Sequence, residues 1–232
     1  MNLPPNDVLR RIYETREVLD ESGRPCIAHS AISPESAWTL YRSVIRFRPV
    51  LVVETGMAYG LSTLSILTAL KENANGGKLI SIDPYQKDSE KGIGLLNVRR
   101  AGLEGLHKWI GEPSHVALPE LHKRRAPVGF AYLDGSHLFD DVLLDLVYMD
   151  KMLPPGGVIG FNDCRWPSVH HTINFLRTHR KYKELDVGLA RNYRSHNPLF
   201  TLTRRLQGRS SADRYFQKIE DWEPPYNYWK RF

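Results

Sequence analysis

The stretch VVETGMAYGLS, from Val52 to Ser62, decides the fold class that we expect for this chain. A short apolar run ends in an acid, Glu54, and two glycines follow at Gly56 and Gly60. A helix-like sequence begins directly after the second glycine. A strand, a glycine-containing turn and a helix, in this order, let the backbone approach a bound nucleotide closely. The stretch therefore predicts a nucleotide-binding unit of an α/β fold.

Strand-like and helix-like segments alternate on both sides of this stretch. The predicted strands are 49–54, 78–83, 107–113, 128–134 and 156–163. The predicted helices are 6–22, a helix starting at Ser33-Pro34, 60–73, 89–103, 138–153 and 169–181. Such alternation predicts a doubly wound, mostly parallel sheet with helices on both faces, which is a Rossmann-like α/β fold.

The C-terminal part departs from this alternation. Residues 182–188 and 199–205 are both strand-like, and we predict no helix between them. They predict an antiparallel hairpin that closes the parallel sheet. The expected organisation is an N-terminal helical segment (1–48), a central domain (49–206) and a basic, aromatic C-terminal extension (207–232).

Composition and charge limit the function classes. The 232 residues are 41% hydrophobic and 25% charged, which is usual for a globular protein. No apolar run approaches the ~20 residues that cross a bilayer, and no secretory signal stands at the N-terminus, so we expect no membrane partner. Two cysteines, Cys26 and Cys164, make no disulfide framework. We therefore expect a cytoplasmic protein with reduced thiols.

The positive charge is concentrated near the C-terminus. Residues 1–163 contain 18 Lys/Arg and 20 Asp/Glu, a net charge of −2, and residues 164–232 contain 14 and 6, a net charge of +8. A basic surface favours an anionic substrate, nucleic acid or a membrane surface. No nucleic-acid-binding motif accompanies the charge, so a solvated basic surface is the preferred interpretation.

Acids end four of the predicted strands, at Glu54, Asp83, Asp134 and Asp163. In a doubly wound sheet, ligands bind at the carboxyl ends of the strands. The G-x-x-x-G spacing lacks the third glycine of the dinucleotide fingerprint G-x-G-x-x-G. A nucleoside without phosphates suits this wider turn, and S-adenosylmethionine adds a positive sulfonium and amino group that suit an acidic rim. Asp83 is placed to accept hydrogen bonds from its ribose hydroxyls.

Four motifs in order carry a resemblance to a known family. ETGMAYGLST and LISIDPYQ resemble class I S-adenosylmethionine-dependent methyltransferases, whose fold is a seven-stranded sheet of this kind. YLDGSHLFDDVLLDL and LPPGGVIGFND resemble the branch of small-molecule and sugar O-methyltransferases of the macrocin and mycinamicin type. The resemblance covers about residues 30–175. It implies a small-molecule acceptor with a hydroxyl group, and many members of the family form homodimers.

The resemblance also implies roles for individual residues. His137 would be the general base, and Asp134 would face the sulfonium and the acceptor. The implied cofactor-binding residues are Glu54, Gly56, Ala58, Tyr59, Gly60, Ser62, Asp83, Glu112, Ser114 and Asp134. A histidine at the start of a helix also occurs as a capping or packing residue, so the base role competes with a structural one.

Several members of the family bind one Mg²⁺, and the resemblance implies a metal site. The residues that match its ligands are Asp134, Asn162 and Asp163. Oxygen ligands suit this hard cation, which would lower the pKa of the acceptor hydroxyl. Close members usually carry two acids where this chain has Asn162-Asp163, so one negative charge is missing. The competing interpretation is that Asp163 caps the following helix.

Two other functions remain open at this point. The chain could methylate RNA or protein, with the basic C-terminal third as the binding surface, although LDGSH stands where amino methyltransferases carry an Asn/Asp-Pro-Pro-Tyr/Phe motif. It could also bind the cofactor without catalysis, since fold does not determine function.

Overall fold

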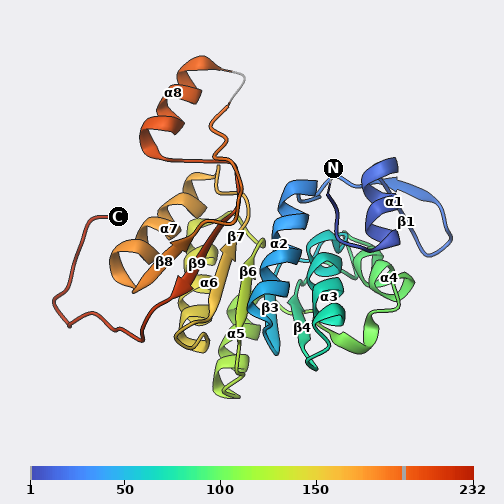
Figure 1. The fold of residues 1–232 in the computed structure, drawn as a ribbon, viewed down its shortest axis with the longest axis horizontal. Coiled ribbons are helices and arrows are strands. Elements are labelled where there is room, and N and C mark those ends of the chain that lie inside the picture. Colours follow the sequence, from blue (N-terminus) through green and yellow to red (C-terminus); the bar gives the residue numbers. More distant parts are fainter. Residues whose placement is uncertain (1, 195–196) are drawn as a thin grey trace.

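A seven-stranded sheet runs through the centre of the molecule, in the order β5-β4-β3-β6-β7-β9-β8 (Figure 1). The computed structural model describes residues 2–194 and 197–232. The first five strands of that order are parallel, and β9 and β8 pair antiparallel to their neighbours. The strands are β3 (Leu51–Thr55), β4 (Lys78–Ile82), β5 (His107–Ile110), β6 (Phe130–Leu133), β7 (Val158–Phe161), β8 (Tyr182–Leu185) and β9 (Arg214–Lys218). The predicted mostly parallel α/β fold is confirmed.

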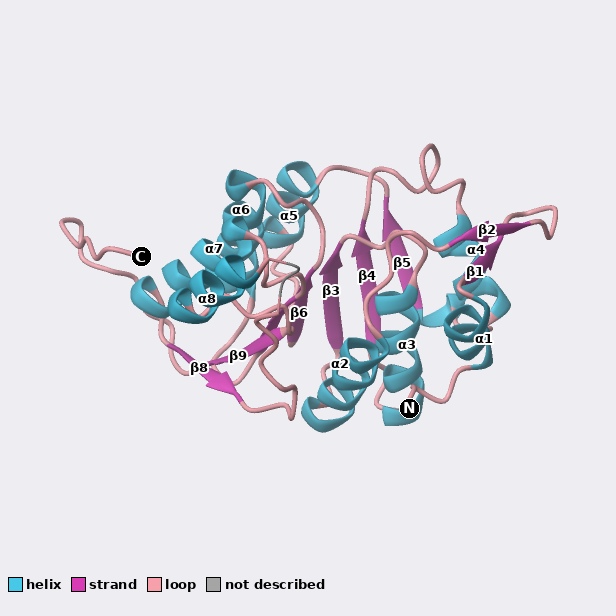
Figure 2. Cartoon of the chain, turned by 90° about the horizontal axis from the view of Figure 1, so that it is seen from above, coloured by secondary structure: helices cyan, strands magenta, loops and turns pink. Residues whose placement is uncertain are grey.

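Helices cover both faces of the sheet, as a parallel sheet requires. Figure 2 shows α2 and α3 on one face and α5, α6 and α7 on the other. The helices are α1 (Asp7–Thr15), α2 (Pro34–Phe47), α3 (Leu61–Asn73), α4 (Ile93–Arg100), α5 (Ser114–Lys123), α6 (Phe139–Met152), α7 (Pro167–His179) and α8 (Pro198–Gln207), with a 3₁₀ turn at Glu104–Leu106. Of these, α5 and α8 were not predicted as helices.

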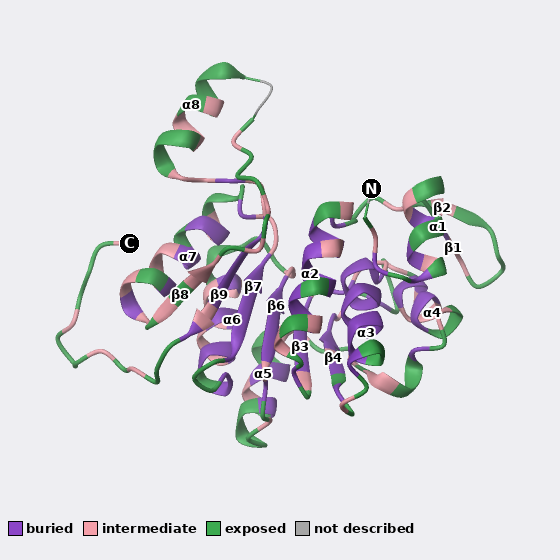
Figure 3. Cartoon of the chain, viewed as in Figure 1, coloured by how far each residue is buried: buried purple, intermediate pink, exposed green. Residues whose placement is uncertain are grey.

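The hydrophobic core is divided by the sheet into two layers. Leu64 and Leu67 of α3 are fully buried in one layer, and Leu146 of α6 and Ile173 of α7 are fully buried in the other. Burial is concentrated in the sheet and in α3, whereas α8 remains exposed (Figure 3). Packing on both faces holds the carboxyl ends of the parallel strands in one place.

The predicted helix at 6–22 is wrong beyond residue 15. Arg16 ends α1 with a left-handed φ of 60°, and a small hairpin follows, with β1 (Glu17–Leu19) antiparallel to β2 (Pro25–Ile27). The Asp20 carboxylate accepts hydrogen bonds from the backbone amides of Ser22 and Arg24. An aspartate that satisfies the amides two and four residues further on favours a turn over a helix.

The closing antiparallel pair is present, but one of its strands was wrongly placed. β8 lies within the predicted segment 182–188, whereas the predicted strand 199–205 is part of helix α8. Asn197 caps this helix by accepting a hydrogen bond from the Leu199 amide at 2.9 Å, and Gly208 ends it with a φ of 69°. The partner of β8 is β9, so residues 214–218 of the expected C-terminal extension belong to the sheet.

The residues after β9 pack against α7. The Tyr228 hydroxyl donates to the Thr178 carbonyl at 2.7 Å, and the His179 ring contacts Tyr228, Trp229 and Phe232. Among the described residues, no helix is both long enough and apolar enough to cross a membrane. Cys26 and Cys164 are free thiols.

Candidate functional site

A cavity of about 950 Å³ opens at the carboxyl ends of the parallel strands. The chain leaves β3 for β4 on one side and later returns to β6 on the other, so the strand order reverses at β3. Ligands of doubly wound sheets bind in the crevice at such a switch point. The turns after β3, β4, β6 and β7 line the cavity together with residues 29–33 and 211 and 213.

Gly56 brings the turn after β3 against the turn after β6. Its φ is +82°, and a Cβ built on it would lie 2.0 Å from the Asp134 carbonyl oxygen. Gly60 also has a positive φ, of +85°, and a Cβ there would lie 3.2 Å from the Gly94 carbonyl oxygen. Gly56 is therefore required by packing between two turns of the protein itself, in addition to any approach of a ligand.

The Asp83 carboxylate ties the end of β4 to this glycine turn. Oδ2 accepts hydrogen bonds from the amides of Met57 and Ala58 at 3.0 and 2.8 Å, and from Nε2 of Gln86 at 3.2 Å. Within the described parts of the chain, Oδ1 accepts a hydrogen bond from the Tyr85 amide alone, at 2.8 Å. Since a carboxylate oxygen has two lone pairs, Oδ1 retains one acceptor position for a ligand hydroxyl.

Glu54 lies beneath the cavity and not in its wall. The side chain is fully buried, and Oε1 accepts hydrogen bonds from the hydroxyls of Thr63 and Ser81 at 2.5 and 2.6 Å. Burial raises the pKa of its carboxyl to about 7, although the hydrogen bonds from those hydroxyls act to lower it. Glu54 joins β3, β4 and the first turn of α3 below the glycine turn.

Two further carboxyls form an acidic wall of the cavity. Burial raises the pKa of Asp134 well above its ordinary value, and the nearby Asp213, Asp163 and Glu54 add to the rise. Asp213 accepts hydrogen bonds from the hydroxyls of Ser36 and Tyr132 at 2.9 and 2.8 Å. Burial still raises the pKa of Asp213 to about 6. A cation placed beside this wall would favour its ionised form.

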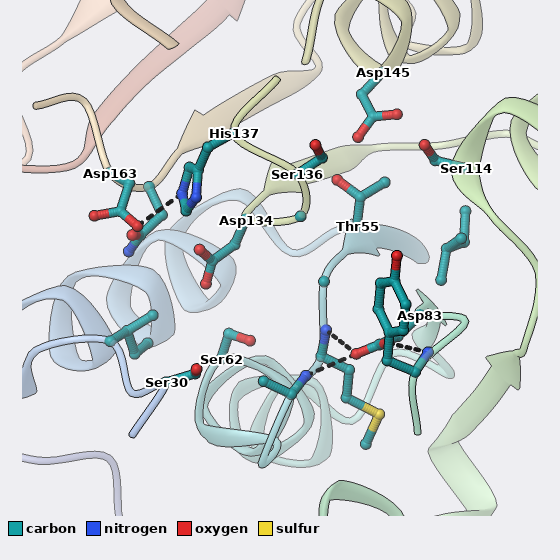
Figure 4. Close-up of a pocket in the computed structure, with 18 of the residues that line it drawn as sticks. Ser30, Thr55, Ser62, Asp83, Ser114, Asp134, Ser136, His137, Asp145 and Asp163 are labelled. Carbon is teal, nitrogen blue, oxygen red and sulfur yellow. Dashed lines mark hydrogen bonds and ion pairs between the residues drawn. The ribbon is translucent and has the colours of Figure 1, made fainter. Parts of the chain in front are cut away.

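His137 and Asp163 form a hydrogen-bonded pair on the same side of the cavity (Figure 4). Nε2 of His137 lies 2.9 Å from Oδ2 of Asp163, and the imidazole stacks on Trp166 with ring centroids 5.2 Å apart. Burial would raise the pKa of Asp163, but the hydrogen bond from His137 and the charge of Arg165 hold it below its ordinary value. Asp163 therefore stays ionised and fixes the orientation of the ring. With Nε2 directed at Asp163, Nδ1 is the nitrogen left to accept a proton.

The predicted metal ligands Asp134, Asn162 and Asp163 do not fit a metal site. Asp163 is already paired with His137 and with Arg165, whose Nε lies 3.3 Å from Oδ1. Asn162 donates its amide hydrogens to the Tyr132 hydroxyl and to Asp213, at 3.1 and 3.2 Å. No group of three or more His, Cys, Asp or Glu within residues 2–194 and 197–232 is arranged to hold a metal ion. The prediction of Mg²⁺ is therefore not supported, because His137 and Arg165 already contact the two carboxylate oxygens of Asp163.

The structure brings most of the other predicted site residues to the cavity. Those that line it are Gly56, Ala58, Ser62, Asp83, Ser114, Asp134 and His137. Those that do not are Glu54, Tyr59, Gly60 and Glu112. Gly60 still positions the start of α3, and Asn97 donates to the Tyr59 carbonyl at 3.0 Å. Glu112 is exposed.

The polar residues that line the cavity and that sequence reasoning missed include Thr55, Glu90, Asp145 and Asp213. One signal was available, because Asp145 interrupts the apolar face of the helix in LLDLV. The buried Oε2 atom of Glu90 has no hydrogen-bond partner among the described residues. Buried polar atoms without partners are uncommon in folded proteins, so this atom suits a bound ligand.

Comparisons with known proteins agree with this geometry. Residues 53–164 match the family described as a methyltransferase domain, and no curated protein matches the chain. The chain is similar to the O-methyltransferase TomG of Streptomyces achromogenes in complex with S-adenosylmethionine, at a TM-score of 0.69 and 13% identity, over 94% of this chain and 92% of that one. It is also similar to the Bacillus cereus O-methyltransferase in complex with S-adenosylhomocysteine (TM-score 0.65, 15% identity, 78% and 84% covered). A third similar structure is the S-adenosylhomocysteine-bound methyltransferase PaMTH1 of Podospora anserina (TM-score 0.66, 12% identity, 93% and 88% covered). The predicted Rossmann-like fold of class I methyltransferases is confirmed.

Proposed function

We propose that this chain is an S-adenosylmethionine-dependent methyltransferase that methylates a hydroxyl oxygen of a small molecule or sugar. The observation that carries the proposal is the cavity at the switch point, which combines an acidic wall with a His137–Asp163 pair. The match of residues 53–164 to a methyltransferase domain supports it. No metal is required in this proposal.

The residues of the cavity fit S-adenosylmethionine in charge and in hydrogen bonding. Asp134 would face its positive charge, and Asp83 would accept one ribose hydroxyl through Oδ1. Glu90, whose Oε2 has no partner among the described residues, is a candidate for the second hydroxyl. When bound, S-adenosylmethionine supplies an electrophilic methyl group on a positively charged sulfur.

His137 would activate the acceptor. Its Nδ1 would take the proton of the acceptor hydroxyl, while Asp163 holds the ring and stabilises the imidazolium that forms. Positioning of the acceptor against the methyl group contributes most of the rate, so the base is expected to add about 10²–10⁴-fold. Trp166 and Arg165 beside the pair would form part of the acceptor wall.

Calorimetric titration tests the cofactor. We expect micromolar binding of S-adenosylmethionine and no measurable binding of NAD. Asp134→Asn should weaken S-adenosylmethionine by about tenfold or more, or about 1.4 kcal/mol, and change S-adenosylhomocysteine little, because the latter lacks the sulfonium charge. Asp140→Asn, an exposed acid on α6, is the matched control. Binding of NAD without S-adenosylmethionine would refute the proposal.

Methyl transfer to a panel of hydroxylated acceptors tests the chemistry. We expect His137→Ala to lower kcat by about 10²–10⁴-fold without changing cofactor affinity, and His122→Ala, an exposed histidine on α5, to change neither. Cofactor binding with no turnover on any acceptor would favour a protein that binds without catalysis. Salt-dependent RNA binding by the basic C-terminal third would favour a nucleic-acid acceptor.

A further inference from the structure

A basic arm joins the last two strands of the sheet and projects from the fold. The arm consists of residues 187–194 and 197–212, and helix α8 forms its outer part (Figure 1). In the sequence, the stretch 187–212 contains five arginines and neither Asp nor Glu. The function proposed above uses none of the residues of this arm.

Helix α8 exposes apolar side chains that belong to neither layer of the core. Leu199, Phe200, Leu202 and Leu206 are 67%, 63%, 53% and 78% exposed. No residue of α8 is buried. A contiguous exposed apolar surface marks a site of interaction with a protein, a ligand or a membrane. We therefore treat α8 as an interaction surface.

The leucines and the arginines lie on different sides of α8. Leu199, Leu202 and Leu206 are three and four residues apart, so they lie along one side of the helix. Arg204 and Arg205 fall outside that line. Neither arginine forms an ion pair with an acid in the described part of the chain. The helix is thus amphipathic, and the protein leaves its positive charge uncompensated.

The base of the arm is fixed beside the cavity. The Ser211 amide donates to the Asn192 carbonyl at 2.7 Å, and the Asn192 amide donates to the Ser210 hydroxyl at 3.2 Å, which joins the two sides of the arm. Nη2 of Arg209 donates to the Arg165 carbonyl at 3.1 Å. Ser211 and Arg165 line the cavity. The arm therefore returns to the sheet at the rim of the cavity.

The charge and the apolar side chains of α8 together favour one kind of partner. A nucleic acid offers phosphates to the arginines but leaves the leucines in water. A second copy of the chain that packed α8 against α8 would cover the leucines but bring two sets of arginines together. An anionic lipid surface matches both features, because its acyl chains accept the leucines and its headgroups pair with the arginines.

We propose that α8 docks this protein on an anionic lipid surface. The helix lies in the plane of the surface, with Leu199, Leu202 and Leu206 towards the acyl chains and Arg204 and Arg205 at the headgroup phosphates. The inference goes beyond the proposed function and does not depend on it, since docking requires neither cofactor nor acceptor. The expectation of no membrane partner rested on spanning and secretory segments, and a helix that lies in the surface needs neither.

Co-sedimentation of the full chain with lipid vesicles tests the proposal. Vesicles of phosphatidylcholine are compared with vesicles of equal parts phosphatidylcholine and phosphatidylserine. We expect binding to the anionic vesicles to be at least about tenfold tighter and to weaken as salt is added. Leu202→Ser combined with Leu206→Ser should weaken this binding by about tenfold or more, because it removes apolar contacts and retains the charge. Arg204→Gln combined with Arg205→Gln should weaken it by about tenfold or more.

Matched controls separate docking by α8 from the general attraction of a basic protein. Arg124→Gln combined with Arg125→Gln removes two adjacent exposed arginines at the end of α5 and should change binding by less than about threefold. Ile27→Ser in β2, at a side chain that is 62% exposed, is the control for the leucines. Thermal unfolding checks that each variant is folded, and Leu206→Ser alone replaces the double leucine variant should the latter not fold.

Several outcomes would overturn the inference. They are binding to neither kind of vesicle, equal binding to both, and equal losses in the arginine variants of α8 and α5. Undiminished binding by the leucine variant would also overturn it, because charge alone would then explain the attraction. A dimer that the leucine variant dissociates, without vesicle binding, would assign α8 to a second copy of the chain. Binding of RNA in place of vesicles would assign it to nucleic acid.

Discussion

Two helices with similar leucine- and threonine-rich sequences have opposite surroundings in this molecule. α3, LSTLSILTALKEN, follows the glycine turn at the cavity, and eleven of its residues are buried. α8, PLFTLTRRLQ, has no buried residue, and Leu199 and Leu206 are 67% and 78% exposed. Figure 3 shows the contrast, with α3 inside the fold and α8 projecting from it. Composition alone therefore does not tell which helix belongs to the core.

The difference shows what stabilises each helix. α3 is held by burial along most of its length, since it packs between α2, α4 and the sheet. α8 depends on local interactions, with the Asn197 cap at one end and Gly208 at the other. Disturbing α3 should therefore change the stability of the whole fold, and disturbing α8 should change α8 alone.

The largest effect is expected at the glycine turn before α3. Gly56→Ala would place a Cβ 2.0 Å from the Asp134 carbonyl oxygen, at a φ of +82°. We expect a loss of at least about 4 kcal/mol in the free energy of unfolding, measured by urea denaturation. Gly23→Ala is the matched control, because Gly23 has a φ of +81° and no atom within 4 Å of the added Cβ. It should lose only about 1 kcal/mol, and equal losses would contradict the role of the contact.

The second prediction compares the two helices by removing one leucine from each. Leu67→Ala in α3 should lower the free energy of unfolding by about 2–5 kcal/mol, because Leu67 is fully buried. Leu206→Ala in α8 should change it by less than about 0.5 kcal/mol. Guanidinium denaturation measures both. A large loss in the α8 variant would mean that α8 is covered in solution, for example by a second copy of the chain.

The third prediction concerns the buried acid beneath α3. Burial raises the pKa of Glu54 from 4.5 to about 7, so the folded state holds this proton more strongly than the unfolded state. The stabilisation is complete below pH 4.5 and is lost as the pH rises through 7, a change of about 3 kcal/mol.

Glu54→Gln should remove that part of the pH dependence, which urea denaturation at several pH values from 4 to 8 measures. The carboxamide oxygen keeps the hydrogen bonds from Thr63 and Ser81. Glu220→Gln, at an exposed position, is the control and should follow the unmodified chain. A variant with the original pH profile would show that Glu54 does not titrate as inferred.

The smallest global effect is expected at the cap of α8. Asn197→Ala removes the acceptor for the Leu199 amide, which should raise hydrogen exchange in α8 and leave global unfolding within about 0.5 kcal/mol. Ser33→Ala removes the matching cap of α2, where Ser33 accepts from the Ser36 amide at 3.0 Å. Because α2 packs on α3, this variant should lose about 1 kcal/mol globally. Similar global losses in both variants would remove the distinction between the helices.

Sequence patterns predicted the parallel part of the fold well. The apolar runs that become β3, β4, β6 and β7 each end at a polar residue or a glycine, and the intervening helices are long and periodic. Sequence patterns predicted the secondary structure near the two ends of the chain less well. Thr201 and Thr203 gave 199–205 a strand-like alternation, although the Asn197-Pro198 start and the Gly208 stop of a helix were present.

The sequence also indicated some residues of the candidate site and missed others. Motifs indicated Asp83, Asp134, His137 and Asp163, because these residues follow β4, β6 and β7. The ends of these strands lie at one edge of the sheet. They did not indicate Asp213, which comes from a segment 50 residues beyond Asp163 and reaches the cavity only because β9 pairs with β7.

The sequence by itself determined the strand and helix order, and thus which acids meet at the switch point, because parallel strands share one carboxyl edge. Tertiary structure alone decided what those acids do. It buries Glu54 under the turn, pairs Asp163 with His137 and Arg165 instead of a metal ion, and buries Asp145 in the wall of the cavity. The physical reason is that burial, pairing and pKa depend on neighbours brought from distant parts of the chain, which no local pattern contains.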